Sequence, residues 1–594
     1  MLWIITVGAG LAIRCWQSPF YIFNSADDDG LMVEMAKGFL DGRWSSSWST
    51  TGTSTMVKPV GFPLFLAGAH FLPWSPLISG YLLYLLGVIL IVNSWRRLSR
   101  SRSQTSILLA ALVLNPIFFA NDSQRIYRDI FVNDIAALAV GLSFVIGTHF
   151  YLSAAAASAT RARVEGAIRS VPGRFQARRL AILGSALLMG GFAGLIMVTK
   201  PTWQWVLPAL LAPLALSTIM PVRRRAMRFV RVIRLTLVII IGSVAAFGVI
   251  EVVKTMNDHT YGVNLVEDFS TGALARTWDV WASVEAGPAR HYVPITRPMR
   301  MAVYKVSPAA AEMENYLEAP TDPWKTLNCR SMHICNESGS LFEWDLQSAA
   351  ASTGRIHSVR NLQQFFTTVA NQISSACASG KLHCTSSPVL ATGLPPLSEI
   401  PLTSVASGTV GGIWAMLWNE VPIEPPPGAA PTAAQYRLWS SVLSGMASPG
   451  TVVRGNSPKI MYTVLRVIDG LYGVFDVALL VVLLLGLPAW ILKTGRLRNQ
   501  GGVFVPAVTL SALFFLSTVL GVGTLAVFSA AQQPGYVLPL YWADFSLPAE
   551  LFVLFGAFAS WPMLRRPSGV ARLLPREQVR ELDVHPPDGR TLTR

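Results

Sequence analysis

The chain has 594 residues, of which 52% are hydrophobic and 14% are charged. Because soluble domains carry about 25% charged residues, this composition excludes an ordinary soluble enzyme and indicates a protein with many membrane helices. The net charge of +15 does not indicate a nucleic-acid surface, because about half of the Lys and Arg residues stand in short clusters between apolar runs, the pattern that marks cytoplasmic loops.

Apolar runs near the ~20 residues needed to cross a bilayer recur along the chain, and we expect about ten membrane helices. An even number of membrane helices places both termini and every basic cluster in the cytoplasm. The first run could instead be a signal peptide ending near Ala26, but it lacks a basic beginning, so we expect a retained helix. The expected spans are 1–18, 75–95, 106–121, 131–152, 181–198, 203–220, 233–253, 467–492, 503–528 and 538–563.

The first predicted external segment opens with "NSADDDGLMVEMAKGFLDGRW", which starts at Asn24. Its apolar residues recur at helical spacing, which predicts an amphipathic helix at the membrane surface. Asp27, Asp28 and Asp29 precede the first turn of that helix. Acids at a helix N-terminus cap free N–H groups, which accounts for one or two of the three and leaves a carboxylate for another role.

Further charged residues fall at junctions on the same predicted side. Lys58 and Pro59 precede a second apolar segment, where a snorkelling lysine is the alternative interpretation. The stretch "NDSQRIYRDIFVNDIAAL" contains Arg128 and Asp129 at the start of the fourth predicted helix. Arg14 lies toward the outer end of the first helix, where snorkelling is the simpler account and a phosphate contact the alternative. Such a site could hold an anionic lipid head group while a carboxylate acts as a base.

Four of the five cysteines fall in one hydrophilic segment of about 200 residues, 254–466, which is predicted to lie outside. It is too long for a simple loop, so we expect a folded extracytoplasmic domain. An even cysteine set there indicates disulfides with three open pairings, of which the nearest-neighbour pairing closes small loops. Adjacent histidines also allow zinc, although the spacing differs from common zinc sites. The cysteines are Cys329, Cys335, Cys377 and Cys384.

The chain therefore divides into four predicted parts. Residues 1–253 form an N-terminal transmembrane module that includes the catalytic external loop, and 254–466 form the disulfide-containing extracytoplasmic domain. Residues 467–564 supply the last membrane helices, and 565–594 form a basic cytoplasmic tail.

Roughly the first 150 residues resemble a known superfamily. The order of residues resembles the first external loop of the GT-C glycosyltransferases, which use polyprenyl-phosphate sugars. Lipid A aminoarabinose transferases and protein O-mannosyltransferases carry a similar acid pair, amphipathic helix and Lys-Pro. "YRDIFVNDIAALAVGL" is similar to the Arg-acid junction that opens a later helix in bacterial members. The matching order is Asp28-Asp29, Glu34-Met35-Ala36, Phe39-Leu40, Gly42 with Trp44, and Lys58-Pro59.

The resemblance implies roles for individual residues. Asp28 matches the acid proposed as catalytic base in the superfamily, and Asp29 matches its acidic partner. Lys58 matches the lysine associated with the lipid phosphate, and Arg128 with Asp129 matches the second junction. The chain departs from the pattern before its last helices, where many members have Arg-Tyr and this chain has Gly-Tyr536.

The resemblance implies a polytopic GT-C-like fold of about ten membrane helices. It implies an inverting membrane glycosyltransferase that moves a sugar from a polyprenyl-phosphate donor to an envelope glycan, lipid or protein acceptor. Its site and large domain would face the periplasm from a bacterial inner membrane, without nucleic acid as a partner. It favours metal independence, with no required cofactor, although a third acid leaves a divalent metal open. The alternatives are a proton-coupled transporter, because acids occur inside predicted helices, and a non-catalytic envelope assembly protein.

Overall fold

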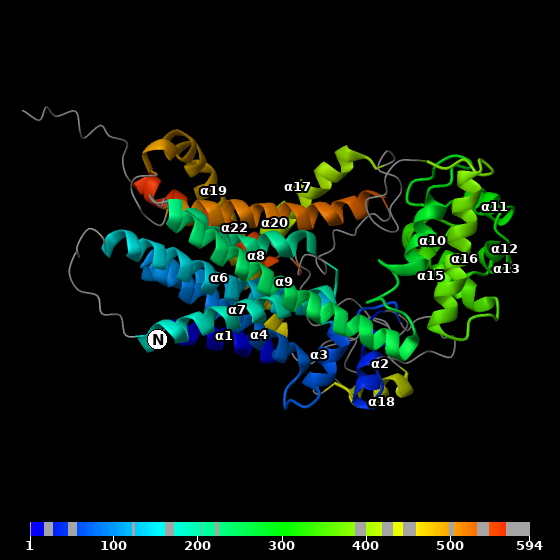
Figure 1. Ribbon diagram of the computed structural model, residues 1–594, viewed down its shortest axis with the longest axis horizontal. Coiled ribbons are helices and arrows are strands. Elements are labelled where there is room, and N and C mark those ends of the chain that lie inside the picture. The colour runs from blue at the N-terminus through cyan, green and yellow to red at the C-terminus, as the bar shows by residue number, and fades with distance from the viewer. Residues whose placement is uncertain are drawn as a thin grey trace, which may run out of the picture.

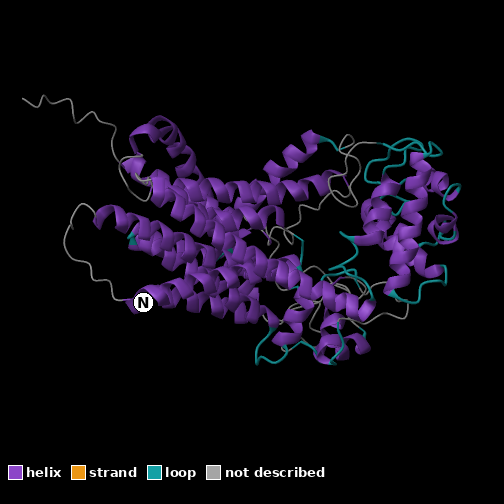
Figure 2. Cartoon of the chain, in the orientation of Figure 1, coloured by secondary structure: helices purple, strands orange, loops and turns teal. Residues whose placement is uncertain are grey.

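The computed structural model is built from helices that form a long bundle with a smaller group of helices at one end (Figure 1). The part of the chain that the structure describes contains no β-strand, only two isolated β-bridges (Figure 2). The described residues are 2–16, 28–44, 56–120, 125–160, 172–201, 203–219, 225–385, 400–418, 432–443, 459–497, 504–531, 544 and 546–565.

Six described helices are long and apolar enough to cross a membrane, as the high apolar content predicts. Three shorter apolar helices lie among them. The N-terminus lies at the end of the bundle opposite the smaller helical group (Figure 1). The long helices are α4 (Pro76–Ser99), α6 (Arg128–Thr160), α7 (Pro172–Met197), α9 (Arg225–Tyr261), α19 (Lys459–Leu497) and α20 (Phe504–Ala531), and the shorter ones are α1 (Leu2–Trp16), α8 (Trp203–Ile219) and α22 (Ser546–Arg565).

The span expected over 106–121 differs from the structure. Helix α5 (Arg102–Val113) has 12 residues, a length of about 18 Å that is short for a ~30 Å hydrocarbon core. It ends because Asn115 accepts a hydrogen bond from the Ile117 N–H and Pro116 begins a separate 3-10 turn. The count of ten crossings therefore stays a prediction.

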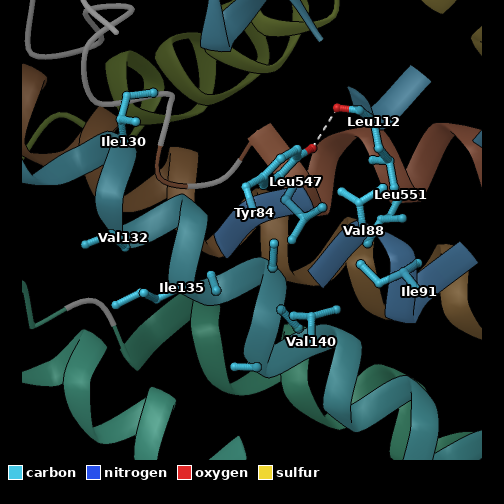
Figure 3. Close-up of a cluster of buried hydrophobic side chains, with 14 of the residues drawn as sticks. Tyr84, Val88, Ile91, Leu112, Ile130, Val132, Ile135, Val140, Leu547 and Leu551 are labelled. Atoms are coloured by element: carbon cyan, nitrogen blue, oxygen red, sulfur yellow. Dashed lines mark hydrogen bonds between the residues drawn. The ribbon is translucent and has the colours of Figure 1, made fainter. Parts of the chain in front are cut away.

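Helix α6 lies at the centre of the bundle and packs against α4, α7 and α8. Its backbone approaches that of α4 closely because both helices have a glycine at the contact, Gly87 in α4 and Gly141 in α6. A Cβ built at Gly87 would lie 2.3 Å from the carbonyl carbon of Ala137. Apolar side chains of α4, α6 and α22 meet around this contact (Figure 3). The Tyr84 hydroxyl donates to the Leu112 carbonyl at 2.9 Å, which ties α4 to α5.

The smaller helical group, here called the helical unit, has its own apolar core, in which Trp278 and Trp281 pack edge-to-face on Phe342. Two disulfides join nearest neighbours, Cys329 with Cys335 and Cys377 with Cys384. The helices of the unit are α10 (Gly272–Ala282), α11 (Arg297–Tyr304), α12 (Pro308–Ala311), α13 (Glu314–Leu317), α14 (Pro323–Met332), α15 (Phe342–Ser352) and α16 (Val359–Ala378).

Two further helices of the 254–466 segment lie against the bundle. Helix α17 (Leu402–Trp418) packs on α19 and α20, and α18 (Ala433–Ser440) packs on α2 (Asp28–Leu40). The His70 ring hydrogen-bonds the Val442 carbonyl at 3.1 Å. The expected division of the chain at these boundaries stays a prediction.

Candidate functional site

Charged side chains from distant parts of the chain gather where the bundle meets the helical unit. Helices α2 and α3 (Gly61–Ala69) lie at the end of the bundle nearest that unit (Figure 1). The start of α6 and the α7–α8 turn contribute further residues there. The sequence predicts this gathering of acids and bases on one face, and the structure brings Asp28, Lys58 and Arg128 together within it.

Asp28 and Lys58 form the ion pair at the centre of the site. The Lys58 Nζ lies 2.8 Å from Asp28 Oδ2, and the Tyr127 hydroxyl donates to the same oxygen at 3.1 Å. Burial raises the pKa of Asp28, but Lys58 and Arg128 outweigh it and hold the pKa below its usual value. Asp28 is therefore an ionised carboxylate that Lys58 and Tyr127 orient and Arg128 stabilises electrostatically.

Lys58 also connects the bundle to the helical unit. Its ammonium lies 5.3 Å from the ring centroid of Trp344 and 5.6 Å from that of Phe269, both within cation–π range. The Asp268 N–H donates to the Met56 carbonyl at 3.0 Å, which fixes the adjacent backbone. Burial lowers the pKa of Lys58 while Asp28 opposes that change.

Asp29 is fully buried and is bound on both oxygens by Arg125. The Arg125 Nε lies 2.7 Å from Oδ2 and its Nη2 lies 2.5 Å from Oδ1, a bidentate geometry that fixes both side chains. The Arg125 guanidinium also stacks 4.5 Å from the Tyr127 ring centroid. This pair therefore positions the Tyr127 hydroxyl that contacts Asp28.

Asp129 faces a different cation. Lys200, in the turn between α7 and α8, contacts the Asp129 carboxylate and lies 2.5 Å from Asp544 Oδ2. The trio joins three helical segments that are far apart in sequence, so the structure gives Asp129 a protein partner, and its contact with substrate stays a prediction.

Arg128 retains hydrogen-bonding capacity toward the site. Its guanidinium lies 6.0 Å from the Tyr127 ring centroid, and the residue is half-buried. It interacts electrostatically with Asp28, Asp129 and Glu267. Among the described residues, its buried Nε has no hydrogen-bond partner. A cation placed in this way can meet an incoming anion without first breaking a bidentate ion pair.

Two acids of the helical unit complete the surroundings of Lys58. The Asp268 side chain is 1% exposed, and burial together with Glu267 raises its pKa to about 8. Burial, Glu267 and Asp268 raise the pKa of Glu343 well above its ordinary value. Neither acid has a role predicted from the sequence, because nothing in the local pattern shows that Glu343 lies near Lys58 and Asp268.

The remaining candidates lie elsewhere. Arg14 is buried in the bundle, where it donates to the Phe118 carbonyl at 2.6 Å and interacts electrostatically with Asp134. Tyr536, like Asp27, lies outside the described residues. Within the described ranges, no three His, Cys, Asp or Glu side chains come together in a way that could hold a metal ion. The expected independence from metal stays a prediction.

Comparisons with known proteins give little guidance. No known protein family and no curated protein matches the chain. Among solved structures it is similar to ArnT from Cupriavidus metallidurans in the apo state, at 12% identity over 94% of this chain and 77% of that chain, with a TM-score of 0.29. The same protein bound to undecaprenyl phosphate gives 13% identity, 94% and 78% coverage and a TM-score of 0.29. A likeness at this TM-score does not establish a shared fold.

We expect Asp29→Asn to destabilise the protein by about 3–5 kcal/mol. The substitution removes the buried carboxylate that balances the charge of the Arg125 guanidinium. Asp41→Asn is the matched control, since Asp41 forms more exposed ion pairs with Lys37 and Arg43 and such pairs contribute little. Thermal unfolding of the purified variants measures both. Equal melting temperatures for the two variants would contradict a structural role for the Asp29–Arg125 pair.

The stability effect of Asp268 depends on pH. The folded state holds its proton up to a pKa of about 8, whereas the unfolded chain releases it near 3.8, so the folded state loses stability as pH rises between these values. We expect Asp268→Asn to raise the melting temperature more at pH 7.5 than at pH 5. The control Asp258→Asn, at an exposed position, should change the melting temperature equally at the two pH values. A gain for Asp268→Asn that is larger at pH 5 would contradict the raised pKa.

Proposed function

We propose that this chain is an integral membrane glycosyltransferase. It transfers a sugar from a polyprenyl-phosphate donor to an envelope glycan, lipid or protein acceptor. The observation that carries the proposal is the ionised Asp28 carboxylate paired at 2.8 Å with Lys58, beside Arg128, at one end of a bundle of apolar helices. A general base next to cations at a membrane boundary is the chemistry that a lipid-linked phosphate leaving group requires.

The reaction follows from these charges. The acceptor hydroxyl attacks the anomeric carbon, and its proton passes to Asp28 as the new C–O bond forms. The bond between the anomeric carbon and the phosphate oxygen breaks, and its electron pair stays on the phosphate. Lys58 and Arg128 neutralise the charge that grows on the leaving phosphate. A single displacement of this kind inverts the anomeric carbon.

The Asp28–Lys58 pair couples donor binding to the basicity of Asp28. In the structure Lys58 holds the pKa of Asp28 low, and a low pKa makes a weak base. A donor phosphate competes for the same ammonium, so donor binding withdraws Lys58 from Asp28. The pKa of Asp28 then rises because its main counter-charge has moved. The base becomes effective only when the donor is in place.

The basic clusters of the sequence support the proposed orientation. The positive-inside rule assigns such clusters to the cytoplasm, which supports our proposal that Asp28 and the helical unit face the periplasm from a bacterial inner membrane. A lipid-linked donor suits this side, because nucleotide sugars do not cross the membrane. The sugar and the acceptor stay open.

A proton-coupled transporter is the competing function, and buried acids in the bundle favour it. Asp476 of α19 and Glu550 of α22 are 2% and 3% exposed. Each has an oxygen with no hydrogen-bond partner within the described part of the chain. Acids inside membrane helices are common in proton relays. A transporter, however, leaves the Asp28–Lys58–Arg128 arrangement at the bundle end without a role.

We expect the protein in lipid nanodiscs to bind undecaprenyl phosphate and Lys58→Ala to weaken that binding at least tenfold, because a buried ammonium is lost from the phosphate. Lys37→Ala is the matched control, since Lys37 is a partly exposed lysine of α2 that pairs with Asp41. Binding is measured by native mass spectrometry, with melting temperatures to confirm folding. Undiminished binding by a folded Lys58→Ala protein would refute the role of Lys58.

A further inference from the structure

The helical unit presents a rigid aromatic surface beside Lys58. Trp344 and Phe269 pack edge-to-face at 4.8 Å, and Trp324 stacks on Trp344 at 5.7 Å. The Trp324 Nε1–H donates to Ser348 Oγ at 2.9 Å, which fixes that ring against α15. All three rings are only partly buried. Lys58 and Trp324 cover part of these rings, and the rest of each ring stays partly exposed next to the ion pair of the site.

Two carboxyl groups, each next in sequence to one of these rings, are buried with hydrogen-bonding capacity that the described residues do not use. Asp268 is 1% exposed, and its Oδ2 lies 3.5 Å from Gln347 Nε2. Asp268 Oδ1 and Glu343 Oε1 are enclosed and have no hydrogen-bond partner among the residues that the structure describes. Glu267 differs, because its carboxylate accepts hydrogen bonds from the backbone N–H groups of Phe269 and Ser270.

The charge state of these carboxyls sets the kind of ligand. The groups that act on Glu343 are Glu267, Asp268, Asp279 and Lys58, and three of the four are acids. The fourth group, Lys58, forms its ion pair with Asp28. Burial and the neighbouring acids raise the pKa of both Asp268 and Glu343, which favours the neutral form of each carboxyl. A neutral carboxyl both donates and accepts hydrogen bonds, and it has no charge with which to attract an anion.

We propose that Asp268, Glu343 and the rings of Phe269 and Trp344 form a saccharide subsite beside Lys58. A sugar ring has an apolar C–H face that packs on aromatic rings and a rim of hydroxyls that pair with neutral carboxyls. The phosphate is held by Lys58 and Arg128, and the uncharged ring lies on the helical unit. This inference rests on the proposed function. The ring belongs either to the donor or to the terminal sugar of the acceptor.

The subsite is tested with the full chain in nanodiscs and a panel of methyl glycosides of common hexoses and pentoses, followed by saturation-transfer NMR. The wild type is expected to bind at least one glycoside, and Glu343→Ala and Asp268→Ala are each expected to weaken that binding at least tenfold. Glu343→Gln keeps the size and neutrality of the side chain, so its binding should stay within about threefold. Glu312→Ala, at a half-buried acid of the same unit that pairs with Arg355, should bind as the wild type does.

The variants separate binding from folding. If no glycoside binds the wild type, or if Glu343→Ala and Asp268→Ala both bind as the wild type does, the subsite is overturned. An equal loss in Glu343→Gln and Glu343→Ala overturns the neutral-carboxyl account. Because Glu343→Gln preserves shape, a melting temperature near that of the wild type keeps the test valid even if an alanine variant unfolds.

Two lipid probes separate this inference from the proposed function and identify the source of the sugar. Undecaprenyl phosphate alone tests the Lys58 site, so its failure to bind defeats the proposed function while the glycoside result still decides the subsite. Undecaprenyl phosphate carrying the bound monosaccharide tests the source. If Glu343→Ala lowers its affinity to that of the bare lipid, the subsite holds the donor sugar. If affinity for this lipid is unchanged while glycoside binding is lost, the subsite holds the acceptor sugar.

Discussion

The ion pair between Asp28 and Lys58 is the interaction on which the rest of the site depends. It joins the first turn of α2 to the segment before α3, and it stands where the membrane bundle meets the helical unit. Tyr127 approaches it from the start of α6, and the rings of Phe269 and Trp344 approach from the helical unit. Charges withdrawn from water must be paired to persist, so this one pair brings four separate segments to a common point.

The surrounding charges divide into those fixed by protein partners and those that can change partners. Asp29 is held on both oxygens by Arg125, and Lys200 joins Asp129 to Asp544. These buried contacts form a fixed frame around the Asp28–Lys58 pair. Lys58 and Arg128 have a different role in the proposed reaction, in which the donor phosphate competes with Asp28 for Lys58 and contacts Arg128 directly. A frame of buried pairs around an exchangeable pair is an arrangement suited to pre-organised electrostatic catalysis.

Local pattern predicts more of the fold than of the site. Hydropathy places nine apolar helices near their observed positions, and the nearest-neighbour disulfides were among the open pairings. The end of α5 was missed because Asn115-Pro116 overrides an apolar run. The positions of Lys200, Asp268 and Glu343 near the site could not be predicted for another reason. Lys200 is separated from Asp544 by 344 positions, and only tertiary packing reveals such contacts.

We propose Asp28 as the base of a lipid-linked sugar transfer. The most direct measurement compares a strain lacking this protein with strains complemented by the wild type or by Asp28→Asn at matched membrane levels, with envelope glycans and polyprenyl-phosphate sugars analysed by mass spectrometry. We expect the null and Asp28→Asn strains both to lose one sugar from one glycan and to accumulate its lipid donor. Restoration of the wild-type profile by Asp28→Asn would contradict it.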